Sequence, residues 1–480
     1  MRHSHRIIRL LARLRERGID HQETDGCAAP PEALMHDRAA SVPTLVISPR
    51  SEWGLGQTLN LLKELDIYRY IPISVKSGGH GYFNGATCKG IMLNLTRMDK
   101  QHISEEVLFI QPGCVLGQLI DLLAKHRKAV PHGDCFGVGV GGHFLTAGWD
   151  PLLARRHGLG CQSVIGGRVI LWDGEVINVD EKNNSSLLRA MRGGGAAGVG
   201  VVTELRLRVF DEPPRATWCF ARLSKDQLSI CRAHEIFSKA WNLPRDISVS
   251  FRFHFDPCQL EPICSFNIYS LLTPDETISH LKVHLGLEIT SYFIDKSKWT
   301  EGPVISSRLI PASKLLTANP GMLAEMSSTS LHKSPLLYWN EQVVLREMGR
   351  SYFTSGSHWI RLDCGAMLEE LYEQFESAQD HPSRNRLYTL VILGGGRMLE
   401  LQEECSMPLG KALARFEGHW DESYEEKRWI RAFTDKLSLI IRNCEDKVLQ
   451  RPYRGDIWTI EQAEDAKLDG TLKTYDRRFT

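Results

Sequence analysis

Three glycine-dense segments constrain this chain more than any other feature of its sequence. They are Ser77–Gly85, Gly133–Gly148 and Gly193–Gly200, and each adjoins a run of residues typical of a β-strand. Glycine accepts positive φ angles and lets peptide N–H groups approach an anion closely. Three such segments in one part of the chain predict an extended, phosphate-bearing ligand that is wrapped by loops.

The string GVGVGG at Gly137–Gly142 invites comparison with the nicotinamide dinucleotide fold. That fold needs a strand directly before the glycines and an acidic residue about 20 positions later. Here the preceding residues, VPHGDCF, make a poor strand, and the segment lies well inside the domain. The sequence therefore disfavours a nicotinamide-type site.

The bulk composition limits the kind of protein. A chain of 480 residues is too long for one ordinary core, so two domains are expected. It contains 58 basic and 58 acidic residues, a balance that predicts neither a nucleic-acid partner nor binding to an acidic membrane surface. The 12 cysteines include no Cys-x-x-Cys pair and no zinc-like spacing, so no metal site is expected.

The first 18 residues never develop the apolar run of a secretory signal, and no stretch reaches the ~18 apolar residues of a membrane span. We therefore expect a soluble cytoplasmic protein with reduced thiols. The same N-terminal stretch places apolar residues on one helical face, surrounded by arginines. This pattern fits a helix docked on the body of the protein, a membrane-surface or targeting helix, or a disordered extension. The apolar residues are Ile7, Ile8, Leu10, Leu11 and Leu14.

Strand and helix patterns divide the chain into four parts. Residues 1–42 form an N-terminal helix and lead-in, and residues 43–212 alternate short strands and helices. The polar segment DEPPRA (Asp211–Ala216) marks a boundary. Residues 213–430 read as an α+β domain, a sheet with helices on one face, and residues 431–480 as a separate C-terminal segment.

At this point the motifs carry a family resemblance. SVKSGGHGYFNG (Ser74–Gly85), PHGDCFGVGVGGHFLTAGW and LLRAMRGGGAAGVGVVTELRLRV resemble the flavin-binding loops of the vanillyl-alcohol-oxidase superfamily, and of its berberine-bridge-enzyme-like branch in particular. The resemblance is dense over residues 43–210 and thin afterwards. It implies an α+β fold with a two-lobed, PCMH-type FAD-binding domain and a substrate domain that has a large antiparallel sheet flanked by helices. It also implies that the last residues return to the FAD domain.

The resemblance assigns the cofactor residues. His80 stands where the family bonds a histidine to the flavin 8α carbon, and Cys135 stands where one branch bonds a cysteine to flavin C6. The alternatives are a polar surface histidine and an inert thiol; Cys161 lacks the motif. The other expected FAD contacts are Ser77, Gly78, Gly79, Gly81, Tyr82, Val138, Gly139, Gly141, Gly142, His143, Gly148 and Val201.

Two covalent bonds would fix the flavin without deep burial, so the pocket could stay wide enough for a bulky substrate. They would also raise the reduction potential of the flavin, which helps it to accept a hydride. In relatives, a valine three residues after the linked cysteine accompanies oxidase activity. Val138 occupies that position, which favours an oxidase that reduces O2 to H2O2 over a dehydrogenase with another acceptor.

The catalytic base is harder to assign. The motif-matched candidate is Glu400 in GGGRMLEL, with a structural pairing to Arg397 as the alternative. The family's late Y-x-N segment is absent in recognisable form, which leaves Tyr453 in RPYRGDIW as a second candidate. Tyr388, on a predicted strand, is a third and weaker one.

We therefore expect an FAD-linked oxidase that acts on a C–O, C–N or activated C–H bond of a bulky small molecule, in secondary metabolism by analogy. An oxidative cyclase that closes a ring in the same pocket is the alternative with the same cofactor. A non-catalytic metabolite-binding scaffold is the alternative of another class. The sequence does not predict the substrate or the oligomeric state.

Overall fold

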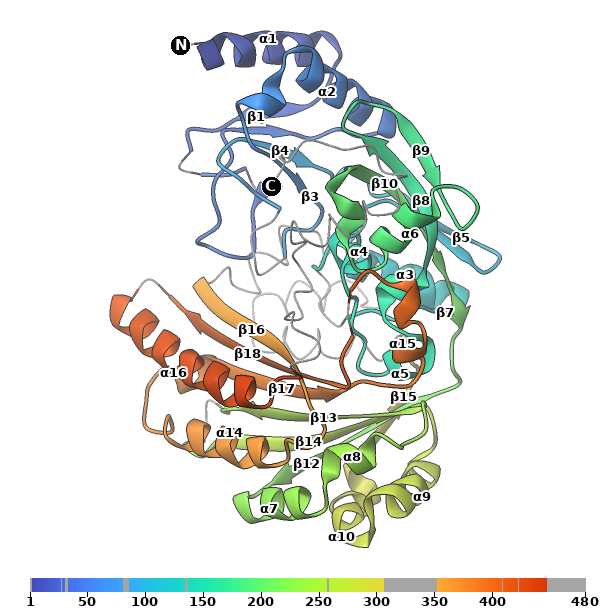
Figure 1. Cartoon of the computed structure of the whole chain (residues 1–480), viewed down its shortest axis with the longest axis vertical. Helices are drawn as coiled ribbons and strands as arrows, with labels where there is room; N and C mark the ends of the chain where they lie inside the picture. The colour runs from blue at the N-terminus through green and yellow to red at the C-terminus, as the bar shows by residue number, and fades with distance from the viewer. Residues whose placement is uncertain are drawn as a thin grey trace, which may run out of the picture.

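The two halves of the chain differ in how their strands pair. The computed structural model describes residues 2–26, 28–30, 33–80, 86–133, 137–256, 259–305, 352–407, 409–421 and 423–446. In these residues an N-terminal lobe holds a four-stranded and a five-stranded sheet, and a C-terminal lobe holds one seven-stranded antiparallel sheet. The predicted α+β architecture, with a large antiparallel sheet in the second half, is confirmed (Figure 1).

The first sheet contains the strand that leads into His80. Its strands lie in the order β1 (His21–Glu23), β2 (Leu45–Ile47), β4 (Ile91–Asn94) and β3 (Ile73–Lys76). Strands β2, β4 and β3 are parallel, and α2 (Glu52–Glu64) connects β2 to β3. The carboxyl ends of parallel strands meet at one sheet edge, so the loop after β3 emerges there.

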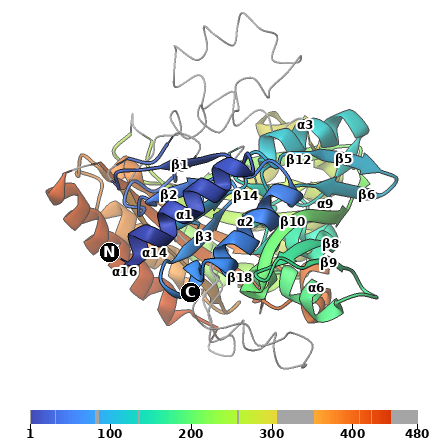
Figure 2. The same ribbon diagram turned by 90° about the horizontal axis from the view of Figure 1, so that it is seen from above.

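The N-terminal helix α1 (Arg2–Glu16) docks on this sheet beside α2 (Figures 1 and 2). Leu10, Leu11 and Leu14 are buried in the core that α2 and the sheet share, whereas Ile8 is 62% exposed. Strand β1 then pairs antiparallel with β2. The segment expected as a lead-in is therefore part of the N-terminal lobe.

The five-stranded sheet contains β10, which begins at Gly200, the last residue of the third glycine segment. Its antiparallel order is β5 (Gln101–Ser104), β6 (Val107–Ile110), β10 (Gly200–Arg208), β8 (Val164–Leu171) and β9 (Val176–Val179). The Asp173-Gly174 pair in the sequence is a strong turn signal that predicts a hairpin, and a hairpin does join β8 to β9, with Gly174 at φ +88°. The other elements of this part are α3 (Leu116–His126), β7 (Lys128–Ala129), α4 (Val140–Leu145), α5 (Ala154–His157), α6 (Ser185–Met191) and β11 (Phe210–Asp211).

The seven-stranded sheet lies beneath the N-terminal lobe in Figure 1, with its helices on the far face. Its order is β15 (Trp299–Gly302), β12 (Ala216–Leu223), β14 (Ile263–Ser270), β13 (Ile247–His254), β17 (Leu387–Leu393), β18 (Ala412–Trp420) and β16 (Tyr352–Ile360). The far-face helices are α7 (Lys225–Ala233), α8 (Ile236–Ala240), α9 (Pro274–Leu285), α10 (Leu287–Thr290), α14 (Ala366–Glu376) and α16 (Tyr424–Asn443).

Alternation along the strands separates the two faces of this sheet. On β13, Val249, Phe251 and Phe253 join the core under the helices. The intervening Arg252 and His254 are only half-buried, on the opposite face. That opposite face, which we call the inner face, is the one turned toward the N-terminal lobe (Figure 1).

The C-terminal boundary differs from the expected one. Helix α16 runs through residue 430, and its apolar stripe packs against the large sheet because Ile430, Phe433, Leu437 and Ile441 recur on one helical face. Residues 431–446 therefore stay with the substrate lobe, and residues 447–480 lie outside the described part of the chain. Within the described residues, no helix combines the length and the apolar composition needed to cross a bilayer.

Buried polar contacts fix the two lobes to each other. Arg155 on α5, 4% exposed, donates to the carbonyl oxygens of Gly394 and Leu243. Gln162 Nε2 donates to the carbonyl oxygen of Met398 at 2.8 Å. An apolar cluster that includes residues of both lobes surrounds these contacts. The inner face of the large sheet is therefore held in a fixed position relative to the glycine loops.

Candidate cofactor and substrate site

Two glycine segments meet backbone to backbone beside His80. Ser77, Gly78 and Gly79 follow β3 directly. A Cβ atom on Gly78 would overlap the backbone of Gly139, and a Cβ atom on Gly139 would overlap that of Gly78. Only glycine permits this approach. Backbone atoms of the loop after β3 and of the loop before α4 are therefore packed directly against each other.

Buried polar groups hold this structure in shape. The carboxylate of Asp150, fully buried, accepts from the backbone N–H groups of His132, Leu152 and Leu153 at 2.8–2.9 Å. His143 Nε2 accepts from the backbone N–H of Gly133 at 3.2 Å. The two ends of the Gly133–Gly148 segment are therefore tied together, which leaves the glycines between them in a defined conformation.

The loops leave the kind of space that a large ligand needs. A Cβ atom on Gly142, at the exposed side of α4, would meet no atom within 4 Å, and the same holds for Gly198 in the third glycine segment. At Gly148 (φ +69°) a Cβ atom would instead lie 2.8 Å from Gly160 Cα. Tight backbone packing beside open glycine surfaces fits an FAD cradle.

The remaining predicted contacts fall into two groups. Val138 is half-buried, and its carbonyl oxygen accepts from the backbone N–H of Leu116 at 2.9 Å. The Val201 side chain is 2% exposed and belongs to the core, so only the backbone of Val201 could contact a ligand. Gly141 is buried against Pro112. Gly81, Tyr82, Cys135 and Tyr453 lie outside the described residues.

His80 lies against a second histidine that the sequence analysis did not select. The imidazole rings of His36 and His80 are stacked, with centroids 4.7 Å apart and planes inclined by 5°. The backbone N–H of His36 donates to the carbonyl oxygen of Gly79 at 2.9 Å. The His36 ring also lies 5.8 Å from that of Phe353 on β16, so this contact joins both lobes.

The protein around His80 favours its neutral form. Part of the ring reaches solvent, yet burial among protein atoms, followed by the charges of His36 and Arg415, lowers the pKa of His80 to about 3. Glu417 acts in the opposite direction. His80 is therefore uncharged at neutral pH. This state suits a histidine that forms a bond to a flavin carbon.

Strand β18 brings three ionisable side chains toward His80. Arg415, Glu417 and His419 alternate with buried residues and so occupy the inner face. Glu417 is 12% exposed, forms an ion pair with Arg415 and lies 3.4 Å from His419 Nε2. Burial would raise the pKa of Glu417, but Arg415 and His419 lower it to about 2. Glu417 is thus a buried, ionised carboxylate facing the cofactor loops.

Tyr388 is the cross-strand neighbour of Glu417 on β17. Burial raises its pKa, so the phenol keeps its proton at neutral pH. The Arg252 guanidinium carbon lies 5.6 Å from the centroid of the Tyr388 ring. A protonated phenol, an ionised carboxylate and two arginines therefore share one patch of the inner face, which we call the polar patch: Arg252, Tyr388, Arg415, Glu417 and His419.

Glu400, the base candidate chosen by motif, lies in different surroundings. It ends α15 (Arg397–Glu400), is 42% exposed, and forms ion pairs with Arg245 and, at 3.3 Å, with Arg397. These contacts favour the structural pairing over the catalytic role. Glu417 was missed because its signal, the alternation of charged residues in ARFEGHW, becomes informative only once the inner face is known.

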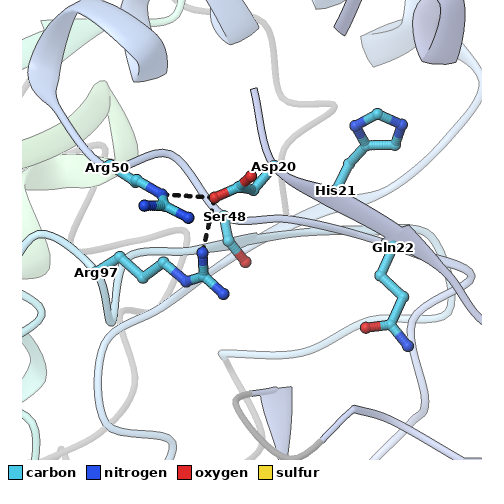
Figure 3. A pocket seen from close by; sticks show the side chains of 6 residues that line it. All are labelled: Asp20, His21, Gln22, Ser48, Arg50 and Arg97. Carbon is cyan, nitrogen blue, oxygen red and sulfur yellow. Dashed lines mark hydrogen bonds and ion pairs between the residues drawn. The ribbon is translucent and has the colours of Figure 1, made fainter. Parts of the chain in front are cut away.

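A separate polar cavity of about 350 Å³ lies by β1 and the ends of β2 and β4 (Figure 3). Asp20 Oδ2 lies 2.6 Å from Arg50 Nε and 2.7 Å from Arg97 Nη1, as Figure 3 shows. The side chains that line it are Asp20, His21, Gln22, Ser48, Arg50 and Arg97. Because Asp20 satisfies both arginines and no predicted site residue lines the cavity, we do not assign the cofactor to it.

Comparisons with known proteins agree with the FAD assignment. Residues 43–180 match the protein family described as FAD binding domain. Chitooligosaccharide oxidase of Gibberella zeae is 38% identical over 162 residues, which are 33% of this chain and 32% of that protein. Berberine bridge enzyme-like 23 of Arabidopsis thaliana is 31% identical over 188 residues, 38% of this chain and 34% of that protein. This chain thus spans about a third of the length of these relatives.

The likeness in three dimensions extends over both lobes. The structure of berberine bridge enzyme from Eschscholzia californica superposes with a TM-score of 0.75 at 16% identity, covering 93% of this chain and 87% of that one. The structure of Physcomitrella patens BBE-like 1 superposes with a TM-score of 0.72 over 96% and 94%. Residues 43–180 are therefore an FAD binding domain, set in a chain that has the fold of the berberine bridge enzymes.

Proposed function

We propose that this chain is an FAD-dependent oxidase of bulky, oxygen-bearing small molecules. The observation that carries the proposal is the approach of the polar patch to His80, which is close enough for Arg415 and Glu417 to influence the His80 pKa. Cofactor loops and an ionised carboxylate thus meet between the two lobes. That is the arrangement required to remove a proton from a substrate held against a flavin.

FAD would be held by backbone groups of Ser77, Gly78, Gly79, Gly139 and Gly142, and bonded through His80 and, from the motif resemblance, Cys135. When bound, it supplies the ring that accepts a hydride from the substrate carbon. The neutral state of His80 supports the first bond, because a protonated imidazole has no lone pair to donate. Gly78 and Gly139 support the cradle, because their packed backbones align the two loops.

Within the polar patch we assign the general base to Glu417. Arg415 and His419 keep Glu417 ionised but, by lowering its pKa to about 2, also weaken it as a base, so we propose that substrate binding displaces at least one of these partners before the proton is taken. Unlike Glu400, which is also ion-paired, Glu417 lies on the inner face near His80. Tyr388 holds its proton, so it serves as a hydrogen-bond donor that orients the substrate oxygen. Arg252 and Arg415 carry only donors and therefore favour a substrate with several oxygen acceptors.

The substrate class is the least determined part of the proposal. Tyr388 offers an aromatic ring beside Arg252, and Phe353 offers one beside His36 and His419. Such rings suit a ring-bearing metabolite, and we propose a role in secondary metabolism on this basis. Glucooligosaccharide oxidase of Sarocladium strictum is 37% identical over 148 residues. Because that match covers only 30% of this chain, oligosaccharide oxidation is the competing candidate.

Anaerobic mixing with a substrate panel tests the proposal. The panel contains neutral oligosaccharides, phenolic alcohols and carboxylated alcohols, and flavin absorbance is followed before and after air is admitted. We expect one class to bleach the flavin and to yield H2O2 on aeration. Bleaching without reoxidation by O2 would indicate a dehydrogenase, and a ring-closed product an oxidative cyclase. A flavin that no substrate in a broad panel bleaches would favour a non-catalytic scaffold.

A further inference from the structure

Two cysteines meet at the end of helix α16, on the far side of the large sheet from the polar patch. Cys444 caps the C-terminus of α16, and Cys364 lies between β16 and α14, 80 positions earlier in the chain. Cys364 Sγ lies 3.5 Å from the carbonyl oxygen of Cys444, and each thiol shifts the pKa of the other. The sulfur atoms are therefore already neighbours in the folded protein.

Backbone contacts hold the two segments together without help from the thiols. The N–H of Arg361 donates to the carbonyl oxygen of Cys444 at 3.0 Å, and the N–H of Asp446 donates to that of Trp359 at 2.9 Å. Ile360 and Glu445 form an antiparallel bridge. These bonds hold the two main-chain segments side by side, which is the arrangement that a disulfide between them requires.

The two thiols differ in access and in charge. Cys444 is half-buried, whereas Cys364 is 3% exposed. The Cys364 thiol lowers the pKa of Cys444, and the Arg361 charge acts in the same direction; the pKa of Cys364 is raised. A more accessible thiol with a lowered pKa beside a buried, protonated thiol is the arrangement in which peroxide oxidises one sulfur and the other resolves it.

A second pair offers an internal comparison. Cys161 and Cys405 also shift each other's pKa, but they are 0% and 3% exposed in the apolar cluster between the lobes. Peroxide has no comparable route to these sulfurs. Of these two pairs, the one at the end of α16 should therefore be the one that reacts in the folded protein.

We propose that Cys364 and Cys444 form a reversible disulfide in response to hydrogen peroxide. The Cys444 thiolate attacks one peroxide oxygen and the O–O bond breaks. Hydroxide is the leaving group, and Cys444 becomes a sulfenic acid. Cys364 sulfur then attacks Cys444 sulfur, and its proton leaves with the departing oxygen as water. In sum, two thiols and one peroxide give one disulfide and two waters. H2O2 is also the product of the proposed oxidase, but the inference does not depend on that activity.

The test uses the full-length reduced protein and added H2O2, followed by alkylation and peptide mapping of the non-reduced protein. We expect one linked peptide that joins Cys364 to Cys444 and disappears on reduction. Cys364→Ser should leave a sulfenic acid on Cys444 that dimedone traps, and Cys88→Ser, which removes another half-buried cysteine, should leave the linkage unchanged. Oxidation of Cys444 without the linked peptide in the wild-type protein, or no reaction of either thiol, would overturn the proposal.

Discussion

The His36 and His80 rings lie parallel, 4.7 Å apart, which places a residue of the N-terminal segment directly against the expected flavin anchor. His36 lowers the pKa of His80 because a charge on either ring disfavours a charge on the other. Burial is the largest cause of the lowered pKa of His80, and the His36 ring adds to it, so the two together keep His80 neutral.

This relationship predicts the titration of His80 in the apoprotein. At about pH 5, where a free histidine with a pKa of about 6.5 is protonated, His80 should remain neutral. Replacement His36→Ala should raise the His80 pKa. NMR spectra of histidine-labelled apoprotein measure both values, and a His80 that titrates near 6.5 in the wild-type protein would contradict this account.

Glu417 is expected to control substrate oxidation. Glu417→Gln keeps the shape but removes the proton acceptor, so flavin reduction should slow by about 10²–10⁴-fold. Glu400→Gln is the matched control, because its exposed carboxylate is occupied by Arg245 and Arg397. Stopped-flow measurement of the rate of flavin reduction by substrate in the two variants shows which carboxylate is the general base. A larger loss in Glu400→Gln would return the catalytic assignment to that residue.

Val138 is expected to affect the reaction with oxygen. Val138→Leu adds bulk to a half-buried side chain beside the cofactor loops, so reoxidation by O2 should slow while flavin reduction by substrate stays unchanged. Val138→Ala serves as the control that removes bulk and should be reoxidised rapidly. Equal reoxidation rates in the three proteins would refute this role for Val138.

Arg155 is expected to stabilise the junction of the lobes. Arg155→Met leaves the carbonyl oxygens of Gly394 and Leu243 without their donor, at a cost of about 2–4 kcal/mol in the free energy of unfolding. Arg156→Met, which breaks an ion pair of a 45% exposed arginine with Asp246, should cost less than about 1 kcal/mol. Denaturant unfolding followed by tryptophan fluorescence compares the two, and similar costs would contradict the burial argument.

His157 is expected to make stability depend on pH. Burial first, and then the charge of Arg156, lower its pKa to about 4 in the folded state, against about 6.5 unfolded. The unfolded chain therefore binds more protons between these values, and stability falls as the pH drops from about 6.5 to 4. His157→Phe should preserve the stacking on Phe210, 4.0 Å away, and flatten this slope. An unchanged slope in thermal unfolding would exclude His157 as the cause.

The cofactor half could be predicted because its function rests on backbone geometry. Gly78 and Gly139 must approach each other, and only glycine satisfies that requirement, so the motif is visible in the sequence. The α+β fold and the hairpin at Gly174 followed from similar local signals.

The substrate half could not be predicted in the same way. Glu417 comes near His80 only because strand pairing places it on the inner face of the large sheet. His36 meets His80 because the chain before β2 folds back onto the loop after β3. Neither contact leaves a local pattern. Glu400 carried the motif, but a four-residue helix directs it toward Arg245. Residues whose role depends on distant partners are those that sequence reasoning missed.

Covalent attachment of FAD at His80 is the central claim, and one measurement tests it most directly. The purified protein is denatured in acid, and its visible spectrum and intact mass are recorded beside those of His80→Ala and Cys135→Ala. We predict that flavin stays with the denatured wild-type protein and that the mass of this protein is higher by one FAD. In each single variant, flavin should stay attached through the one remaining bond. Complete release of flavin from the denatured wild-type protein would contradict both covalent assignments and would leave only the fold of the FAD binding domain.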